Sequence, residues 1–135
     1  MTDGYYRWPT VYKEQLSFVC EDDLWTVPLK GGIPRRLTAD LGQCTQPLYS
    51  PDGKSLAFIN TDEGHQEVYI MPAEGGEAKR LTFFGTSVTR MAAWKPDGSA
   101  IICSTSAQQT IRRMVGLFSV SPQWRNYNDA WATDP

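Results

Sequence analysis

Short apolar runs alternate with clusters of turn-forming residues along most of the chain, and no segment shows a sustained 3.6-residue apolar period. The run KSLAFIN follows Pro51-Asp52-Gly53, and the run SAIICS follows Pro96-Asp97-Gly98. Proline presets φ for a turn, Asp bonds the following backbone, and Gly tolerates positive φ. The pattern therefore predicts short antiparallel strands joined by hairpins, with little helix.

A unit of about 44 residues recurs along the chain. Residues 25–38, WTVPLKGGIPRRLT, align without a gap with residues 69–82, YIMPAEGGEAKRLT, and six of the fourteen positions are identical. The full unit reads as aromatic-x-Pro-Asp-Gly, strand, acidic loop, strand, Gly-Gly, and a strand ending in Leu-Thr, and only the middle copy is complete. Four short strands in a unit of this length indicate a blade of a β-propeller.

We therefore predict an all-β fold of about two and a half to three four-stranded antiparallel blades in an incomplete ring. Residues 1–120 form the partial propeller, with blades at approximately 5–42, 43–86 and 87–120. Hairpin turns are expected at Asp52-Gly53, Gly75-Gly76 and Asp97-Gly98. Six strand residues are expected to be buried between blades: Leu56, Phe58, Val68, Ile70, Leu81 and Ile101.

Residues 121–135 depart from the repeat and are predicted to form an atypical tail. Trp124 and Arg125 stand where the next glycine pair is expected, so the third blade loses that hairpin and the sequence leaves its outer strand open. Trp124, Tyr127 and Trp131 are candidates to cover the open face of the third blade.

The formal net charge of −2 gives no electrostatic basis for binding nucleic acid or an anionic membrane surface. No apolar stretch reaches the length that spans a bilayer, and the N-terminus lacks the basic start and apolar run of a secretory signal. The chain has an odd number of cysteines, Cys20, Cys44 and Cys103. No two of them form a CxxC motif, and each falls in or near an apolar run. They are predicted to be buried free thiols in a reducing, cytoplasmic compartment.

His65 is the only histidine, and it lies in the loop NTDEGHQE. Beside Asp62 and Glu63 it could serve as a general base or a metal ligand, but one histidine does not supply the usual zinc set, and the loop lacks the ligand pattern of a calcium site. We therefore predict a solvated loop at the blade rim. A serine triad would need His65 as its base, whereas Ser50 is explained by the turn that it begins.

The other candidates for chemistry are weaker. Nothing near Cys44 would lower its pKa, so a nucleophilic role is not expected. The Gly-Gly pairs match no phosphate-binding motif. Arg35-Arg36 and Lys79-Arg80 could contact peptides, or they could be edge-strand charges that discourage unwanted pairing. We predict no catalytic residue, no metal and no cofactor, and the sequence assigns no peptide-contacting residue.

The repeat resembles the propeller blades of TolB-like and dipeptidyl-peptidase-like proteins, and more specifically the N-terminal end of tricorn-type proteases. Four stretches carry the resemblance, which covers roughly residues 5 to 120: LSFVCEDDLWTVPLKGGIPRRLT, SPDGKSLAF, EGHQEVYIMPAEGGEAKRLTFFG and WKPDGSAIICST. It implies a large cytosolic peptidase that trims oligopeptides, with propellers that filter or channel them. The serine nucleophile and its histidine lie far downstream in that family, so no catalytic residue carries over.

Two functions remain open on the sequence alone. The favoured one is a non-catalytic propeller fragment of a tricorn-like serine protease, which binds and gates peptides in cytosolic proteolysis. The alternative is a free-standing TolB-like module for protein–protein interaction. Because a closed propeller needs at least about four blades, a homo-oligomer that closes the ring is a further expected partner.

Overall fold

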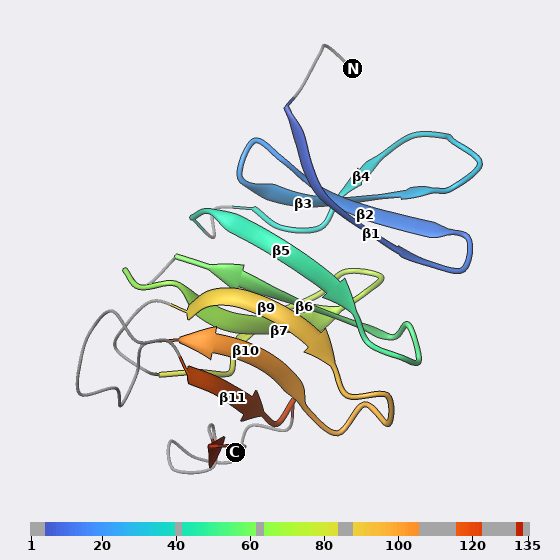
Figure 1. Ribbon diagram of the computed structural model, residues 1–135. Coiled ribbons are helices and arrows are strands. Elements are labelled where there is room, and N and C mark those ends of the chain that lie inside the picture. Colours follow the sequence, from blue (N-terminus) through green and yellow to red (C-terminus); the bar gives the residue numbers. More distant parts are fainter. Residues whose placement is uncertain are drawn as a thin grey trace.

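The computed structural model describes residues 5–39, 42–61, 64–83, 88–105, 116–122 and 132–133. These residues form strands, turns and loops, with no helix among them. The strands build three separate four-stranded antiparallel sheets, which lie one on another (Figure 1). The predicted all-β fold of incomplete propeller blades is confirmed.

Each sheet is a meander in which consecutive strands are neighbours. The first sheet contains β1 (Tyr6–Tyr12), β2 (Gln15–Cys20), β3 (Asp23–Pro28) and β4 (Arg35–Arg36). The second contains β5 (Cys44–Tyr49), β6 (Ser55–Asn60), β7 (Glu67–Pro72) and β8 (Lys79–Arg80). The third contains β9 (Val88–Trp94), β10 (Ile101–Thr105), β11 (Gly116–Val120) and β12 (Ala132–Thr133).

The outer strand of the third sheet comes from the segment that departs from the repeat. In β12, Ala132 pairs with Ser119 and Thr133 pairs with Phe118 of β11. The third sheet thus has four strands although it lacks the Gly-Gly hairpin, which answers the question that the sequence left open. Trp124, Tyr127 and Trp131 lie outside the described residues.

The three predicted hairpin turns are confirmed. In the turn between β5 and β6, Asp52 Oδ1 accepts hydrogen bonds from the Ser50 hydroxyl at 2.6 Å and from the Lys54 N–H at 2.9 Å. These bonds, the Ser50 bond first, hold the pKa of Asp52 below its usual value. Gly98 between β9 and β10, and Gly75 between β7 and β8, each donate to a carbonyl three residues earlier.

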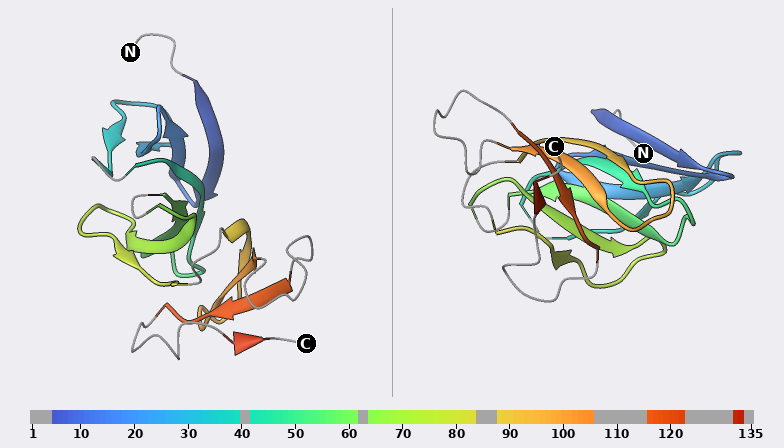
Figure 2. Two further views of the ribbon diagram at one scale, coloured as in Figure 1. Left: turned by 90° about the vertical axis from the view of Figure 1, so that its left-hand side faces the viewer. Right: turned by 60° about the horizontal axis from the view of Figure 1, so that its bottom comes forward.

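The sheets are arranged as a fan. The first strands of neighbouring sheets are in contact, β1 with β5 and β5 with β9. Figure 2 shows the sheets spreading apart from this inner edge. The first strands therefore form the concave side of the fan, and the last strands form its outer rim.

Apolar side chains fill both spaces between the sheets, so the second sheet is buried on both faces. Leu56 and Phe58 of β6 face the first sheet, whereas Ala57 and Ile59 face the third. This placement explains why LAFI is a continuous apolar run and not an alternating one, as expected for a strand covered on both sides.

The predicted burial holds for five of the six residues: Leu56, Phe58, Val68, Leu81 and Ile101. It is wrong for Ile70, which is only partly buried although it packs against the cluster between the second and third sheets. Ile70 pairs with Lys79 of the outer strand β8. Ile70 lines an open hollow between the two Pro-Asp-Gly turns, so its side chain is covered only in part.

Aromatic residues before each Pro-Asp-Gly turn tie one sheet to the sheet before it. The Tyr49 hydroxyl and Ser17 Oγ of the first sheet are 2.6 Å apart and share a hydrogen bond. The Trp94 indole N–H donates to the Leu48 carbonyl of the second sheet at 3.1 Å. The aromatic position of the repeat is thus an inter-blade contact, and its polar atom finds a partner inside the interface.

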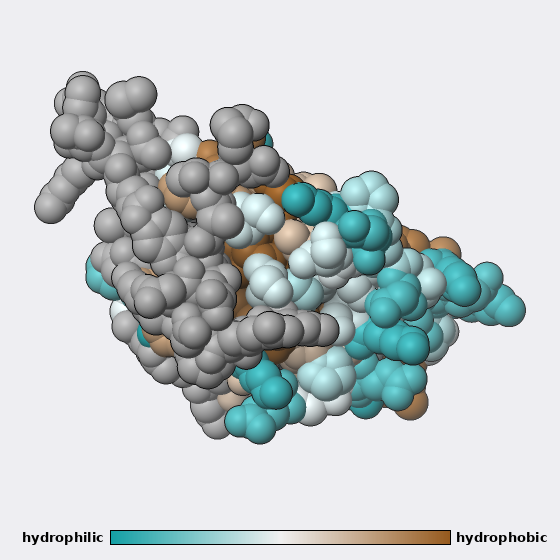
Figure 3. Space-filling view, turned by 90° about the horizontal axis from the view of Figure 1, so that it is seen from below, coloured by the Kyte–Doolittle hydropathy of each residue, from teal (hydrophilic) through white to brown (hydrophobic). Residues whose placement is uncertain are grey.

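The side of the third sheet that points away from the second is not packed against another described sheet. Figure 3, which looks onto this side, shows apolar residues in the middle, with hydrophilic residues along one flank. The opposite end of the stack, the outer side of the first sheet, is in the same situation. The fan therefore ends in two sheet faces that no further described blade covers.

Alanine substitutions at two equivalent turn glycines separate backbone strain from packing. Gly53 and Gly98 have φ of 73° and 75°, so either substitution places alanine in a left-handed conformation that costs about 1–2 kcal/mol. A Cβ on Gly53 would collide with the Tyr12 ring, whereas one on Gly98 would meet only Pro51, at 4.0 Å. We expect Gly53→Ala to lower the free energy of unfolding in urea by about 1–3 kcal/mol more than Gly98→Ala. Equal losses would show that Tyr12 moves aside freely.

Candidate functional site

The Leu-Thr ending of the second blade is held by a buried carboxylate. The Thr82 hydroxyl donates to Glu67 Oε2, and Thr82 Oγ1 accepts the Val68 N–H at 2.9 Å. Arg80 Nη2 lies 3.4 Å from Glu67 Oε1, and the Glu67 side chain is 1 % exposed. The carboxylate charge is thus neutralised and hydrogen-bonded where water does not reach, as a buried charge requires.

The first blade repeats this arrangement 44 residues earlier. The Thr38 hydroxyl donates to Asp23 Oδ1 at 2.8 Å and accepts the Leu24 N–H at 3.0 Å. Arg36 Nη2 lies 2.5 Å from Asp23 Oδ2. Arg36 and Arg80, two of the four basic candidates, are therefore engaged in closing their own blades, while Arg35 and Lys79 are exposed.

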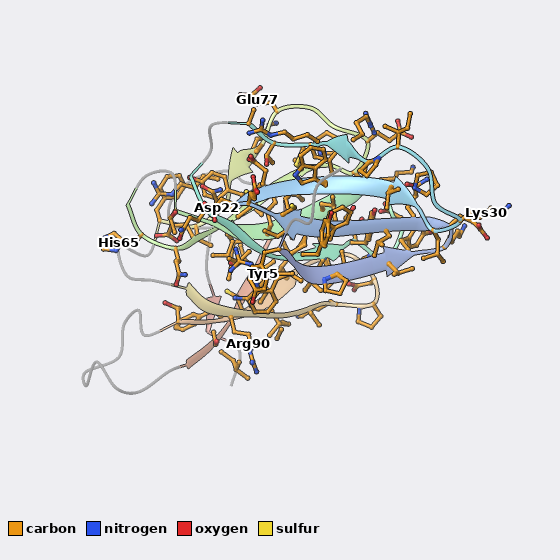
Figure 4. All side chains as sticks on the ribbon, turned by 90° about the horizontal axis from the view of Figure 1, so that it is seen from above. Tyr5, Asp22, Lys30, His65, Glu77 and Arg90 are labelled. Carbon is orange, nitrogen blue, oxygen red and sulfur yellow. The ribbon has the colours of Figure 1, made fainter. Side chains whose placement is uncertain are left out.

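His65 lies at an exposed position in the loop between β6 and β7, at the end of the molecule opposite Lys30 (Figure 4). Ser50 precedes β6, whereas His65 follows it, so a strand of about 20 Å separates them. The Ser50 hydroxyl is already used in the Asp52 turn. The structure therefore does not bring the two together; Asp62 and Glu63 lie outside the described residues.

All three cysteines are buried and free. Burial raises the pKa of Cys44 to about 11, and Asn60 Nδ2 donates to its sulfur at 3.0 Å. Burial, with the charge of Glu67 as a second cause, raises the pKa of Cys103 to about 12. The pKa of Cys20 is also raised, by burial and then by Glu21. A thiol with such a pKa is almost fully protonated at neutral pH, which argues against Cys44 as a nucleophile.

An open groove of about 490 Å³ crosses β1, β5 and β9 on the concave side of the fan. Two X-Pro dipeptides shape it, Trp8-Pro9 and Gln46-Pro47, where Trp8 and Gln46 have φ of 56° and 54°. Proline donates no ladder hydrogen bond, and the pairing register shifts at both positions. Bulges of this kind re-aim side chains, and here they turn the inner strands toward a shared hollow.

The groove, which we call the inner groove, carries polar groups of several kinds. The Gln46 side-chain oxygen accepts the Met91 N–H at 2.9 Å and joins β5 to β9. The Trp8 side chain is 43 % exposed, and Arg90 is also exposed (Figure 4). Among the described residues, no carboxylate forms an ion pair with Arg90.

Two buried polar atoms belong to the residues that immediately precede Trp8 and Gln46, the two residues of the inner groove with positive φ. Arg7 Nε and Thr45 Oγ1 have no hydrogen-bond partner within the part of the chain that the structure describes. Buried groups of this kind are rare in folded proteins. Sequence reasoning missed the inner groove, although RWPT at 7–10 and TQPL at 45–48 signal it, because a proline inside a strand marks an interrupted ladder.

A second cavity, of about 550 Å³, lies between the first and second sheets near the turns. Its lining combines Lys13 and Arg35 with Glu14 and Glu74, so its charges balance. It also lies against Gly53 and Tyr12, the contact that packs the two blades together. The inner groove is the stronger candidate because its cation has no acidic neighbour in the lining.

The stacked four-stranded meanders, with first strands gathered at one edge, define an incomplete β-propeller. The profile of the tricorn protease N-terminal β-propeller domain matches residues 3–131. The chain belongs to this family.

Proteins of known sequence agree with this assignment. The chain is 41 % identical over 110 residues to tricorn protease homolog 1 of Streptomyces coelicolor, a match that covers 82 % of the chain and 10 % of that protein. It is 35 % identical over 132 residues to the tricorn protease of Thermoplasma acidophilum, covering 88 % of the chain and 12 % of that protein. The chain thus spans about a tenth of the length of these relatives.

Solved structures show the same fold. The crystal structure of the tricorn protease superposes with a TM-score of 0.76 at 31 % identity, over 88 % of this chain and 12 % of that one. A TolB structure from Agrobacterium tumefaciens superposes with a TM-score of 0.74 over 97 % of this chain and 48 % of that one. At 17 % identity, the second likeness shows the fold alone. Within the described ranges, no helix has the length and apolar character of a membrane span.

Removing the threonine hydroxyls tests how the blades are closed. Thr82→Val leaves the Glu67 carboxylate and the Val68 N–H short of a partner, and we expect it to lower the free energy of unfolding by about 1–3 kcal/mol. The matched Thr38→Val should cost less, because Asp23 is 14 % exposed and water replaces the lost bond. Urea denaturation at neutral pH measures both. A larger loss for Thr38→Val would contradict the proposed role of burial.

The raised pKa values predict which thiols resist modification. At mildly alkaline pH, iodoacetamide should leave Cys44 and Cys103 of the native chain unmodified, because their thiolates form only near pH 11 and 12. Cys20 is 8 % exposed and should react faster than either. Mass spectrometry of digested protein measures labelling, and unfolding in guanidinium should make all three reactive. Fast labelling of native Cys44 would contradict this account.

Proposed function

We propose that this chain is a non-catalytic propeller section of a tricorn-like serine protease and that its inner groove binds peptides. The observation that carries the proposal is the groove itself, with the exposed Trp8 and Arg90 on the concave side of the fan. Membership of a family named for a protease supplies the context in which peptides are the ligand.

The chemistry of the inner groove suits an extended peptide. Arg90 provides a guanidinium for a carboxylate, either the C-terminus or an acidic side chain, and such charge-assisted bonds are among the stronger ones. Trp8 offers an aromatic surface to an apolar side chain.

Gating follows from where the groove lies. The first strands of a propeller line its central channel, so a peptide held on β1, β5 and β9 would lie at the channel wall. We propose that such binding selects peptides on their way to a catalytic part elsewhere in the protease, in the cytoplasm. Catalysis by this chain is not part of the proposal, because Ser50 and His65 stand at opposite ends of β6.

A free-standing interaction module is the second candidate. The TolB structure superposes over 97 % of the chain, so the described architecture also fits the propeller of a protein that is not named as a peptidase. In that case the partner is a folded protein, and short peptides would not bind in the inner groove. The two functions therefore differ in one measurable property, the affinity for short peptides.

Peptide binding is testable by fluorescence anisotropy with labelled, unstructured peptides that end in a free or an amidated carboxyl group. We expect the wild-type chain to prefer the free carboxylate, and Arg90→Ala to weaken its binding about tenfold or more, the value of a charge-assisted hydrogen bond. Arg35→Ala, which removes an exposed arginine outside the groove, is the control and should bind normally.

Recovered peptides should be intact by mass spectrometry, and cleavage that His65→Ala abolishes would contradict a non-catalytic role. Equal affinity of wild type and Arg90→Ala for both peptide forms would rule out the inner groove. No binding of any peptide would favour the interaction module.

A further inference from the structure

The outward face of the first sheet carries the same kinds of side chain as the face of the second sheet that is buried against the first. In the first sheet, Leu16 pairs with Val27 and Phe18 with Trp25, and these side chains point away from the second sheet. We call this set the back face of the first sheet. In the second sheet, Leu56 pairs with Met71 and Phe58 with Tyr69, and that back face is packed against the first sheet.

The outward face of the third sheet, in turn, matches the surface that receives a back face. In the first sheet the receiving side chains are Ser17, Val19, Leu24 and Thr26, two aliphatic and two hydroxyl-bearing. In the third sheet the outward side chains are Ile102, Ser104, Leu117 and Ser119, which have the same composition. We call the latter set the front face of the third sheet.

Both faces carry side chains that are exposed to solvent, fully or in part. Leu117 is 60 % exposed on the front face, where Figure 3 shows apolar residues. On the back face, Leu16, Trp25 and Val27 are half-buried. An apolar cleft of about 210 Å³ lies beside Leu16 and Phe18. Each chain therefore presents one half of a blade–blade interface at each end.

We propose that two copies of this chain associate head to tail, with the front face of each third sheet on the back face of the partner's first sheet. The internal contact between the first and second sheets is the template for this joint. Two identical joints related by a two-fold axis close on themselves, so the assembly stops at a dimer with six blades. The joint is independent of peptide binding, and neither result bears on the other.

Sedimentation velocity of the 15.2 kDa chain at low and high micromolar concentration tests the association. A dimer at high concentration is expected. Leu117→Lys on the front face and Val27→Glu on the back face should each weaken dimerisation at least about a hundredfold, because both joints would bury an unpaired charge. Ile33→Lys, at a 92 % exposed loop position, is the matched control and should dimerise like the wild type.

Mixing the two variants distinguishes head-to-tail packing from any symmetric contact of like faces. A heterodimer of Leu117→Lys with Val27→Glu has one unaltered joint, and its other joint pairs lysine with glutamate. We therefore expect the mixture to dimerise although neither variant does so alone. Circular dichroism and urea midpoints of the separate variants check that each is folded.

Three outcomes overturn the proposal. The first is a folded monomer at every concentration, as for a chain whose tail covers its own open face. The second is a dimer that Leu117→Lys leaves intact, and the third is a mixture of variants that stays monomeric. As an independent readout, Cys20 on the back face should be labelled more slowly as the dimer forms, and an unchanged rate would contradict burial of that face.

Discussion

A four-stranded sheet with apolar side chains on both faces needs a neighbour on each side, and the rest of this structure depends on that constraint. The second sheet satisfies it, since Phe58 packs toward the first sheet and Ile59 toward the third. The sheets bury their apolar faces by stacking on one another, because a sheet of four short strands is too small to close around a core of its own. The fan, its concave inner edge and its two open ends all follow from sheets that are covered only by one another.

The turns and most of the core were predictable because they depend on neighbouring residues. Pro51-Asp52-Gly53 dictates its own turn, and LAFI indicates a strand that is covered on both faces whichever sheets cover it. Ile70 was not predictable, since its exposure depends on the open hollow that the turns of two neighbouring sheets leave beside it. The strand β12 was missed for a related reason: its two residues carry no pattern, and only pairing with β11 defines them.

The candidate site likewise has parts that the sequence predicts and parts that depend on contacts between distant residues. Sequence alone places Arg36 and Arg80 on edge strands, but the carboxylates that engage them lie 13 residues earlier and meet them only through strand pairing. The inner groove requires three strands from three blades, so no local pattern contains it. Its two left-handed residues, Trp8 and Gln46, are each strained by about 1–3 kcal/mol, and strain of this kind persists where the surrounding structure enforces it. For Gln46, the side chain is tied to β9 by its hydrogen bond with the Met91 N–H.

The third blade shows what the closing carboxylate contributes. Asp23, Glu67 and Gly116 are the first residues of the third strands of their sheets, so glycine stands where the other two blades have an acid. Without that side chain, no threonine or arginine can be held as in the first two blades, and the two-residue strand β12 pairs only with Phe118 and Ser119. Among the described residues, the outer rim of the third blade is therefore joined to β11 by strand pairing, without the carboxylate that ties the outer strands of the first two blades.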